Sequence, residues 1–266
     1  MKKPTVGQII QKKKQGEPIV ILTAYDALWA SLLRDSGVEI ILVGDSVGMV
    51  LLGYETTTSV TMEEMIHHAK ASRRGAPEAF LIGDMPFGSY HQTPQQSVAN
   101  AFRFIREAGC DAVKIEWHSR VVEMVQAMVT AGIAVMGHVG LTPQTVSQLA
   151  GYKVQGRDPG RAKEILEGAM ALEKAGCFSV VLECIPEQLA AEITRKLQVP
   201  TIGIGAGSKV DGQVLVTQDL LGLFDRFVPR FVKRYANLRE EAVKAIQTFR
   251  QEVEEKKFPS KEHVFT

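Results

Sequence analysis

The chain has 266 residues, and its 31 basic and 30 acidic side chains give a formal net charge of +1. This balance gives no reason to expect nucleic acid or a membrane surface as a partner, and no apolar run approaches the ~20 residues of a membrane span. Its cysteines, Cys110, Cys177 and Cys184, have neither metal-ligand nor CxxC spacing, so we expect unpaired thiols in a soluble, cytoplasmic protein.

Short apolar runs recur along the chain, and glycine or a polar residue closes each one. Runs of this length are typical of strands buried on both faces of a parallel sheet. The last run is the least regular. The predicted strands span residues 19–23, 40–44, 80–83, 112–115, 134–139, 179–182, 201–204 and 213–216.

Amphipathic segments separate these runs. Thr61 begins one of them with an acidic first turn, and apolar residues follow it at helical spacing. Gly109, Gly132 and Gly176 stand where a helix would use glycine to end. Further helices are predicted over residues 95–108, 120–131, 159–175 and 187–197, and a charged amphipathic helix over 236–257 precedes an extended tail, 258–266.

Strands that alternate with helices over this length predict an α/β fold, a (β/α)8 TIM barrel. The alternative is an open, doubly wound parallel sheet. We expect one domain over residues 1–266, with an N-terminal helix and a C-terminal helical extension that lies outside the barrel. No low-complexity linker interrupts the chain.

Charged residues follow the predicted strands at their carboxyl ends, where the active site of a TIM barrel lies. Asp45 and Asp84 each follow an apolar run directly, and Lys114 and Glu116 point to the same side of their strand. Such charges are costly to bury unless they are paired. The other polar residues at these ends are Asp26, Ser46, His138, Glu183 and Ser208.

Several carboxylates on neighbouring strands repel one another, and a cation would offset that repulsion. Oxygen ligands favour Mg²⁺, which usually takes one or two carboxylates and keeps several waters. Zn²⁺ fits less well, because His138 is the one histidine at a strand end. Lys114 and Glu116 form either a salt bridge in the barrel mouth or part of a substrate and metal site. Glu183 lies in apolar sequence, which raises a carboxyl pKa and suits a general base.

The glycine-rich segment 203–208 has the pattern GxGxGS. A dinucleotide-binding loop would read GxGxxG and would usually open the first strand–helix–strand unit. This segment lies after six predicted strands, so we interpret it as a tight loop that allows a ligand close to the backbone.

Long motifs in order along the chain resemble the ketopantoate hydroxymethyltransferase family. Two of them, residues 43–54 and 84–90, contain Asp45 and Asp84. The likeness covers nearly the whole chain and continues through residues 137–144, 151–157, 203–207 and 211–216 to about 231–236.

The resemblance implies a barrel of the phosphoenolpyruvate/pyruvate type, Mg²⁺ dependence and assembly into a homodecamer. It implies that Asp45 and Asp84 bind the metal directly and that Glu116 holds it directly or through water. The substrate-binding residues would be Asp45, Ser46, Asp84, Lys114 and His138, and Glu183 would accept the proton.

The implied reaction transfers a hydroxymethyl group from 5,10-methylenetetrahydrofolate to 3-methyl-2-oxobutanoate through a Mg-stabilised enolate. The product is 2-dehydropantoate, in the first step of pantothenate biosynthesis. The chain departs from the family at Trp117 and His118, where two glycines are usual, and this bulk bears on folate access. The rival functions are a Mg²⁺-dependent reaction at a C–C bond of another 2-oxo acid and a non-catalytic metabolite-binding barrel.

Overall fold

The computed structural model describes residues 3–148 and 153–265. Gly151 and Tyr152 of the family-like motif, and Thr266 of the predicted tail, lie outside the described residues. The chain divides into two compact units, Met1–Val216 and Thr217–Thr266. A single domain over 1–266 stays a prediction.

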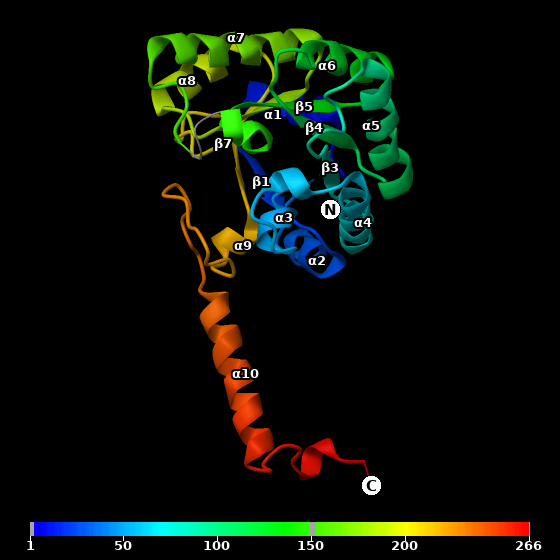
Figure 1. Ribbon diagram of the computed structural model, residues 1–266, viewed down its shortest axis with the longest axis vertical. Helices are drawn as coiled ribbons and strands as arrows, with labels where there is room; N and C mark the ends of the chain where they lie inside the picture. The colour runs from blue at the N-terminus through cyan, green and yellow to red at the C-terminus, as the bar shows by residue number, and fades with distance from the viewer. Residues whose placement is uncertain (1–2, 149–152, 266) are drawn as a thin grey trace. The chain divides into compact units, whose positions relative to one another are not determined.

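The first unit, shown in Figure 1, is a closed barrel of parallel strands in chain order. Strand β8 pairs with β1 and closes the ring. This closure confirms the predicted TIM barrel and excludes the open sheet. The observed strands match the apolar runs to within one residue at either end. They are β1 (Ile19–Thr23), β2 (Ile40–Val43), β3 (Phe80–Asp84), β4 (Ala112–Glu116), β5 (Val135–Gly140), β6 (Ser179–Glu183), β7 (Thr201–Ile204) and β8 (Gly212–Leu215).

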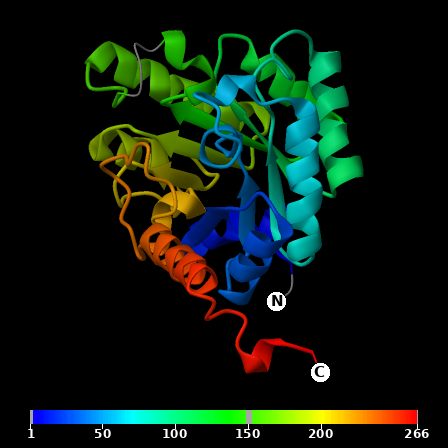
Figure 2. The same cartoon turned by 60° about the horizontal axis from the view of Figure 1, so that its bottom comes forward.

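Helices follow the strands and cover the outside of the ring, as the turned view in Figure 2 also shows. Six helices of this unit were predicted, including the N-terminal one; α2 and α3 had no prediction. The helices are α1 (Val6–Gln15), α2 (Ala27–Asp35), α3 (Val47–Val50), α4 (Met62–Gly75), α5 (Pro94–Ala108), α6 (Val121–Thr130), α7 (Pro159–Ala175) and α8 (Glu187–Lys196), with 3-10 turns η1 (Thr57–Ser59) and η2 (Pro143–Gln148).

Local sequence explains where these helices begin and end. Thr61 caps α4 through a capping box, in which its hydroxyl accepts from Glu64 N and the Glu64 carboxylate accepts from Thr61 N at 2.8 Å. Helix α7 starts at Pro159 after the cap Asp158 and ends at Gly176, whose φ of 107° is left-handed. The predicted boundaries at Thr61 and Gly176 are therefore confirmed.

The barrel has an inner and an outer apolar layer. The inner layer comes from alternate strand residues such as Ile82, Ala112, Met136 and Val181. Because strand side chains alternate between faces, the next inward positions along these strands are Asp84, Lys114, His138 and Glu183. The pattern that fills the barrel with apolar side chains thus places charged ones at its carboxyl-terminal mouth.

The second unit contains α9 (Thr217–Leu220), α10 (Leu238–Glu254) and η3 (Lys261–His263). Helix α10 confirms the predicted C-terminal amphipathic helix. It has no buried residue, and Val243, Ile246, Phe249 and Val253 on it are exposed. Among the described residues, no helix is long and apolar enough to span a membrane.

Candidate active site

Strand register brings the predicted charged residues together at the barrel mouth. Asp84 on β3 stands opposite Lys114 on β4, and Glu116 on β4 stands opposite His138 on β5. Glu183 on β6 pairs with Gly140, two residues beyond His138. The cluster therefore runs across four neighbouring strands.

Asp45, Asp84 and Lys114 form one half of this cluster, and all three are buried. Lys114 Nζ lies 2.9 Å from Asp84 Oδ1. The other carboxylate oxygen of Asp84, Oδ2, accepts from Asp45 N at 3.1 Å. This bond ties the loop after β2 to the end of β3, so the two aspartates are adjacent, as the sequence predicts for a shared site.

His138 joins the second half of the cluster. Its Nδ1 lies 3.5 Å from Glu116 Oε1 and 3.4 Å from Lys114 Nζ, and its Nε2 lies 3.2 Å from Glu183 Oε2. Glu116 and His138 are buried, whereas Glu183 is half-buried at the mouth. The His138 imidazole thus links Glu116, which lies beside the aspartates, to Glu183, which lies beside solvent.

Ser46 follows Asp45 directly and is half-buried. Its Oγ lies 2.8 Å from the hydroxyl of Tyr25, which follows β1. Ser46 therefore joins the same end of the barrel from the loop after β2, where the sequence places it.

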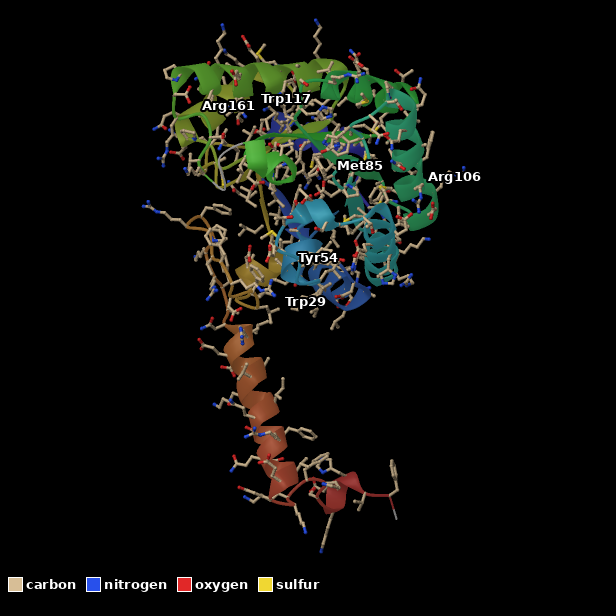
Figure 3. All side chains as sticks on the ribbon, viewed as in Figure 1. Trp29, Tyr54, Met85, Arg106, Trp117 and Arg161 are labelled. Carbon is tan, nitrogen blue, oxygen red and sulfur yellow. The ribbon has the colours of Figure 1, made fainter. Side chains whose placement is uncertain are left out.

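Two residues of this site had no prediction. Gln144, in η2 after β5, donates through Nε2 to Asp45 Oδ2 and to the Met85 carbonyl, both at 2.9 Å, and its backbone N donates to Glu116 Oε2 at 3.1 Å. Met85, labelled in Figure 3, directly follows Asp84. Tyr90 donates its hydroxyl proton to Gln144 Oε1 and accepts from Glu116 N. The side chains of Gln144 and Tyr90 are both buried. Their roles depend on partners that are distant in sequence, so the sequence alone carries no signal for them.

The electrostatics of the aspartate half favour a cation. Burial and the charges of Asp84 and Glu116 raise the pKa of Asp45 well above its ordinary value, and burial raises the pKa of Asp84 despite Lys114 beside it. Burial lowers the pKa of Lys114, but Asp84, Glu116 and Asp45 together outweigh burial and raise it. The ammonium is therefore charged, and the carboxylates around it still outnumber it.

His138 is also held in its charged form. Burial and Lys114 lower its pKa, but the carboxylates of Glu116 and Glu183 outweigh them and raise it to about 9. Tyr90 stays protonated, because burial and the charge of Glu116 raise its pKa. The site thus offers N–H and O–H donors beside its carboxylates.

Two further candidates, Asp26 and Ser208, form their hydrogen bonds with residues outside the charged cluster. Asp26 caps α2, with Oδ1 accepting from Trp29 N at 2.8 Å. Ser208, in the glycine-rich loop, donates through both N and Oγ to Glu187 Oε1 at 3.1 Å. The three cysteines are free, as predicted.

The donor set at this site is made of oxygen atoms. Within residues 3–148 and 153–265, no group of three or more His, Cys, Asp or Glu side chains forms a ready-made metal-binding set. Asp45 and Asp84 nevertheless supply two adjacent buried carboxylates whose repulsion Lys114 offsets only in part. Two protein carboxylates with water in the other positions suit Mg²⁺, so the residues present fit that ion.

Sequence comparison identifies relatives over the full length of the chain. The family model described as ketopantoate hydroxymethyltransferase matches residues 3–261. A relative from Heliobacterium modesticaldum, 3-methyl-2-oxobutanoate hydroxymethyltransferase, is 52% identical over 264 residues, which cover 99% of this chain and 96% of the relative. One from Desulfotalea psychrophila with the same name is 52% identical over 262 residues, 98% of this chain and 94% of its own.

Solved structures share the fold at low sequence identity. Phosphoenolpyruvate phosphomutase from Streptomyces platensis subsp. rosaceus has a TM-score of 0.64 at 15% identity, covering 99% of this chain and 92% of its own. 2,3-Dimethylmalate lyase, described as a member of the PEP mutase/isocitrate lyase superfamily, has a TM-score of 0.61 at 15% identity, with 98% and 91% covered. These likenesses support the barrel fold of this chain; a barrel of the phosphoenolpyruvate/pyruvate type stays a prediction.

Proposed function

The chain belongs to the ketopantoate hydroxymethyltransferase family, and we propose that its one-carbon donor is 5,10-methylenetetrahydrofolate and that the strand-end cluster carries the reaction. As an enzyme of that family it transfers a hydroxymethyl group to 3-methyl-2-oxobutanoate, in pantothenate biosynthesis. The proposal thus concerns the donor, the metal and the residues that do the chemistry.

Asp45 and Asp84 would hold Mg²⁺ directly, and Glu116 would hold it directly or through water. One observation carries this assignment: three buried carboxylates gather around the single ammonium of Lys114, which lies 2.9 Å from Asp84. When bound, Mg²⁺ supplies Lewis-acid polarisation of the 2-oxo group, which acidifies the hydrogen on C3 of the substrate.

The 2-oxo acid would bind beside these residues. The cations Lys114 and His138 neutralise its carboxylate, since carboxylates in the low-dielectric barrel mouth hold both in charged form. Ser46 offers a hydroxyl on the same side. Together these donors fix the orientation of the substrate before any proton moves.

Glu183 would accept the C3 proton. It is the carboxylate of the cluster that is only half-buried, and its Oε2 contacts His138 Nε2 at 3.2 Å. His138 would hold the carboxylate in position for the proton transfer. The resulting enolate carbon forms the new C–C bond to the one-carbon unit of 5,10-methylenetetrahydrofolate. Overall one water is consumed, its oxygen becomes the hydroxyl of 2-dehydropantoate, and tetrahydrofolate leaves.

We also propose a cytoplasmic homodecamer. The exposed apolar side chains on α10 support an assembled state, since an exposed apolar helix face often marks an interaction surface. Light scattering coupled to size-exclusion chromatography measures the mass; a monomer at micromolar concentration would overturn the assembly.

Deuterium exchange at C3 of 3-methyl-2-oxobutanoate tests the chemistry. Proton NMR in heavy water, without folate, measures this exchange. We expect exchange with Mg²⁺ and its loss after chelation. No exchange at saturating Mg²⁺ by folded protein would overturn the proposed mechanism. Exchange of the C3 hydrogen by a protein that binds no tetrahydrofolate would overturn only the assignment of the one-carbon donor.

A further inference from the structure

A cavity of about 490 Å³ lies beside the charged cluster. Trp117 and His118, which line it, directly follow Glu116, and Val139 and Gly140 directly follow His138. The cavity and the cluster therefore share the ends of β4 and β5. Its volume lies within the ~300–1,000 Å³ of ordinary small-molecule sites.

Aromatic side chains form one wall of this cavity. The rings of His91 and His118 stack, with centroids 4.7 Å apart and planes 18° apart, and the Phe87 ring meets His91 at 5.0 Å. Phe87 is 45% exposed although it lines the cavity. A wall of flat rings, one of which is partly exposed, suits a planar heteroaromatic ligand.

The two imidazoles also offer hydrogen-bond donors. Arg120 N donates to His118 Nδ1 at 3.3 Å, so the neutral ring carries its proton on Nε2. That Nε2 is buried and has no hydrogen-bond partner among the described residues. Gly88 N likewise donates to His91 Nδ1 at 3.2 Å. A ligand with a carbonyl or ring-nitrogen acceptor would satisfy the unpartnered donor.

Helix α7 supplies another part of the cavity lining and a cation. The Trp117 ring packs so closely on Gly168 that a Cβ there would lie 3.2 Å from it. Arg161 lines the cavity from the first turn of α7, where its Nη1 lies 2.8 Å from the exposed carboxylate of Glu164. Figure 3 labels Trp117 and Arg161 beside this helix. The cavity thus combines an aromatic wall with a partly exposed guanidinium.

We propose that this cavity binds the folate donor, with the pterin ring on Phe87, His91 and His118 and the glutamate carboxylates toward Arg161. This inference rests on the proposed function, which requires a one-carbon unit to reach C3 of the oxo acid. The pterin ring of the folate is planar and carries a carbonyl acceptor, which suits Phe87, His91 and His118. The glutamate tail of the folate is anionic, which suits Arg161. Trp117 and His118, which line the cavity, form part of this subsite.

Binding of tetrahydrofolate to single variants tests the subsite by calorimetry under anaerobic conditions. We expect Phe87→Ala and His118→Leu to raise its dissociation constant about tenfold, the usual size of a lost stacking contact. His118→Gln keeps an N–H donor and should recover part of the affinity. Phe102→Ala is the matched control, because Phe102 is 38% exposed on α5 and does not line the cavity.

A second probe, 6-methyltetrahydropterin, separates ring from tail because it lacks the glutamate. Phe87→Ala should weaken both probes, whereas Arg161→Gln should weaken tetrahydrofolate about threefold, as a solvent-screened ion pair allows, and leave the pterin unchanged. In each variant the dissociation constant of 3-methyl-2-oxobutanoate serves as the reference for a folded site.

The outcomes are distinct for the two proposals. Wild-type affinity for tetrahydrofolate in both Phe87→Ala and His118→Leu would overturn the subsite and leave the proposed function intact. If wild-type protein exchanges the C3 hydrogen but binds no tetrahydrofolate, the donor assignment fails and the subsite with it. Selective weakening in the cavity variants supports both.

Discussion

Tyr90 donates its hydroxyl proton to Gln144 Oε1 at 2.7 Å, and this bond decides which end of the Gln144 amide faces Asp45. With Oε1 engaged, Nε2 is the atom that reaches Asp45 Oδ2, at 2.9 Å. Tyr90 therefore orients a proposed metal ligand through Gln144.

Tyr90→Phe should weaken binding of Mn²⁺, used in place of Mg²⁺, about tenfold, because partners behind a metal ligand typically contribute ten- to hundredfold. Electron paramagnetic resonance of free Mn²⁺ measures the affinity. Tyr54→Phe is the control, since Tyr54 bonds Glu64 at 2.5 Å, outside the cluster. Wild-type Mn²⁺ affinity in folded Tyr90→Phe would contradict this role.

Glu183→Gln should bind 3-methyl-2-oxobutanoate but exchange its C3 hydrogen at least about a hundredfold more slowly, because an amide cannot accept the proton. Proton NMR in heavy water gives the rate, and calorimetry the affinity. Glu192→Gln provides the comparison, since the Glu192 side chain on α8 is 41% exposed and pairs with Lys196. Full exchange in Glu183→Gln would remove Glu183 from the base role.

Lys114→Met should destabilise the metal-free protein by about 3–5 kcal/mol, because it leaves the buried Asp84 carboxylate without its cation. Adding Mg²⁺ should restore part of the loss, and so should the second change Asp84→Asn. Thermal unfolding with and without Mg²⁺ measures both effects. Equal melting temperatures of wild type and Lys114→Met in chelator would show that the Lys114–Asp84 pair adds nothing to the stability of the fold.

Gly140→Ala should impair the fold at the active site. A Cβ at Gly140 would lie 2.2 Å from the Glu183 carbonyl, and the φ of +100° is unfavourable for alanine as well. Gly132→Ala shares the positive φ, +84°, but its Cβ would meet nothing within 4 Å. Urea unfolding should show a loss of about 1 kcal/mol for Gly132→Ala and a clearly larger one for Gly140→Ala. Equal losses of stability in the two variants would contradict the close approach of Gly140 to the Glu183 carbonyl.

The thiols should react only at high pH. Burial raises the pKa of Cys110 and of Cys184 to about 12, so both stay protonated through pH 9 in the folded chain. Iodoacetamide at pH 8 should therefore label them about a thousandfold more slowly than in the unfolded chain. Because unfolded thiols lose their protons first, stability should fall as pH rises from about 9 toward 12. Rapid labelling of the folded protein would refute this.

Much of the barrel could be predicted because its causes are local. Strands β1 and β7 match the apolar runs at both ends, and α7 matches its prediction from Pro159 to Ala175, since its cap and terminal glycine are written in the sequence. Helix α2 had no prediction. Asp26 begins it, and an aspartate after a strand can serve as a helix cap or as a ligand.

The sequence by itself determined which carboxylates, which lysine and which histidine stand at the strand ends, because side-chain alternation and chain order fix the mouth of a parallel barrel. Only the tertiary structure decided how Gln144 reaches Asp45, 99 residues away, and how His91 and His118 come to stack. Such contacts depend on strand register and loop packing. No local preference encodes them, because each forms only when segments distant along the chain are folded against one another.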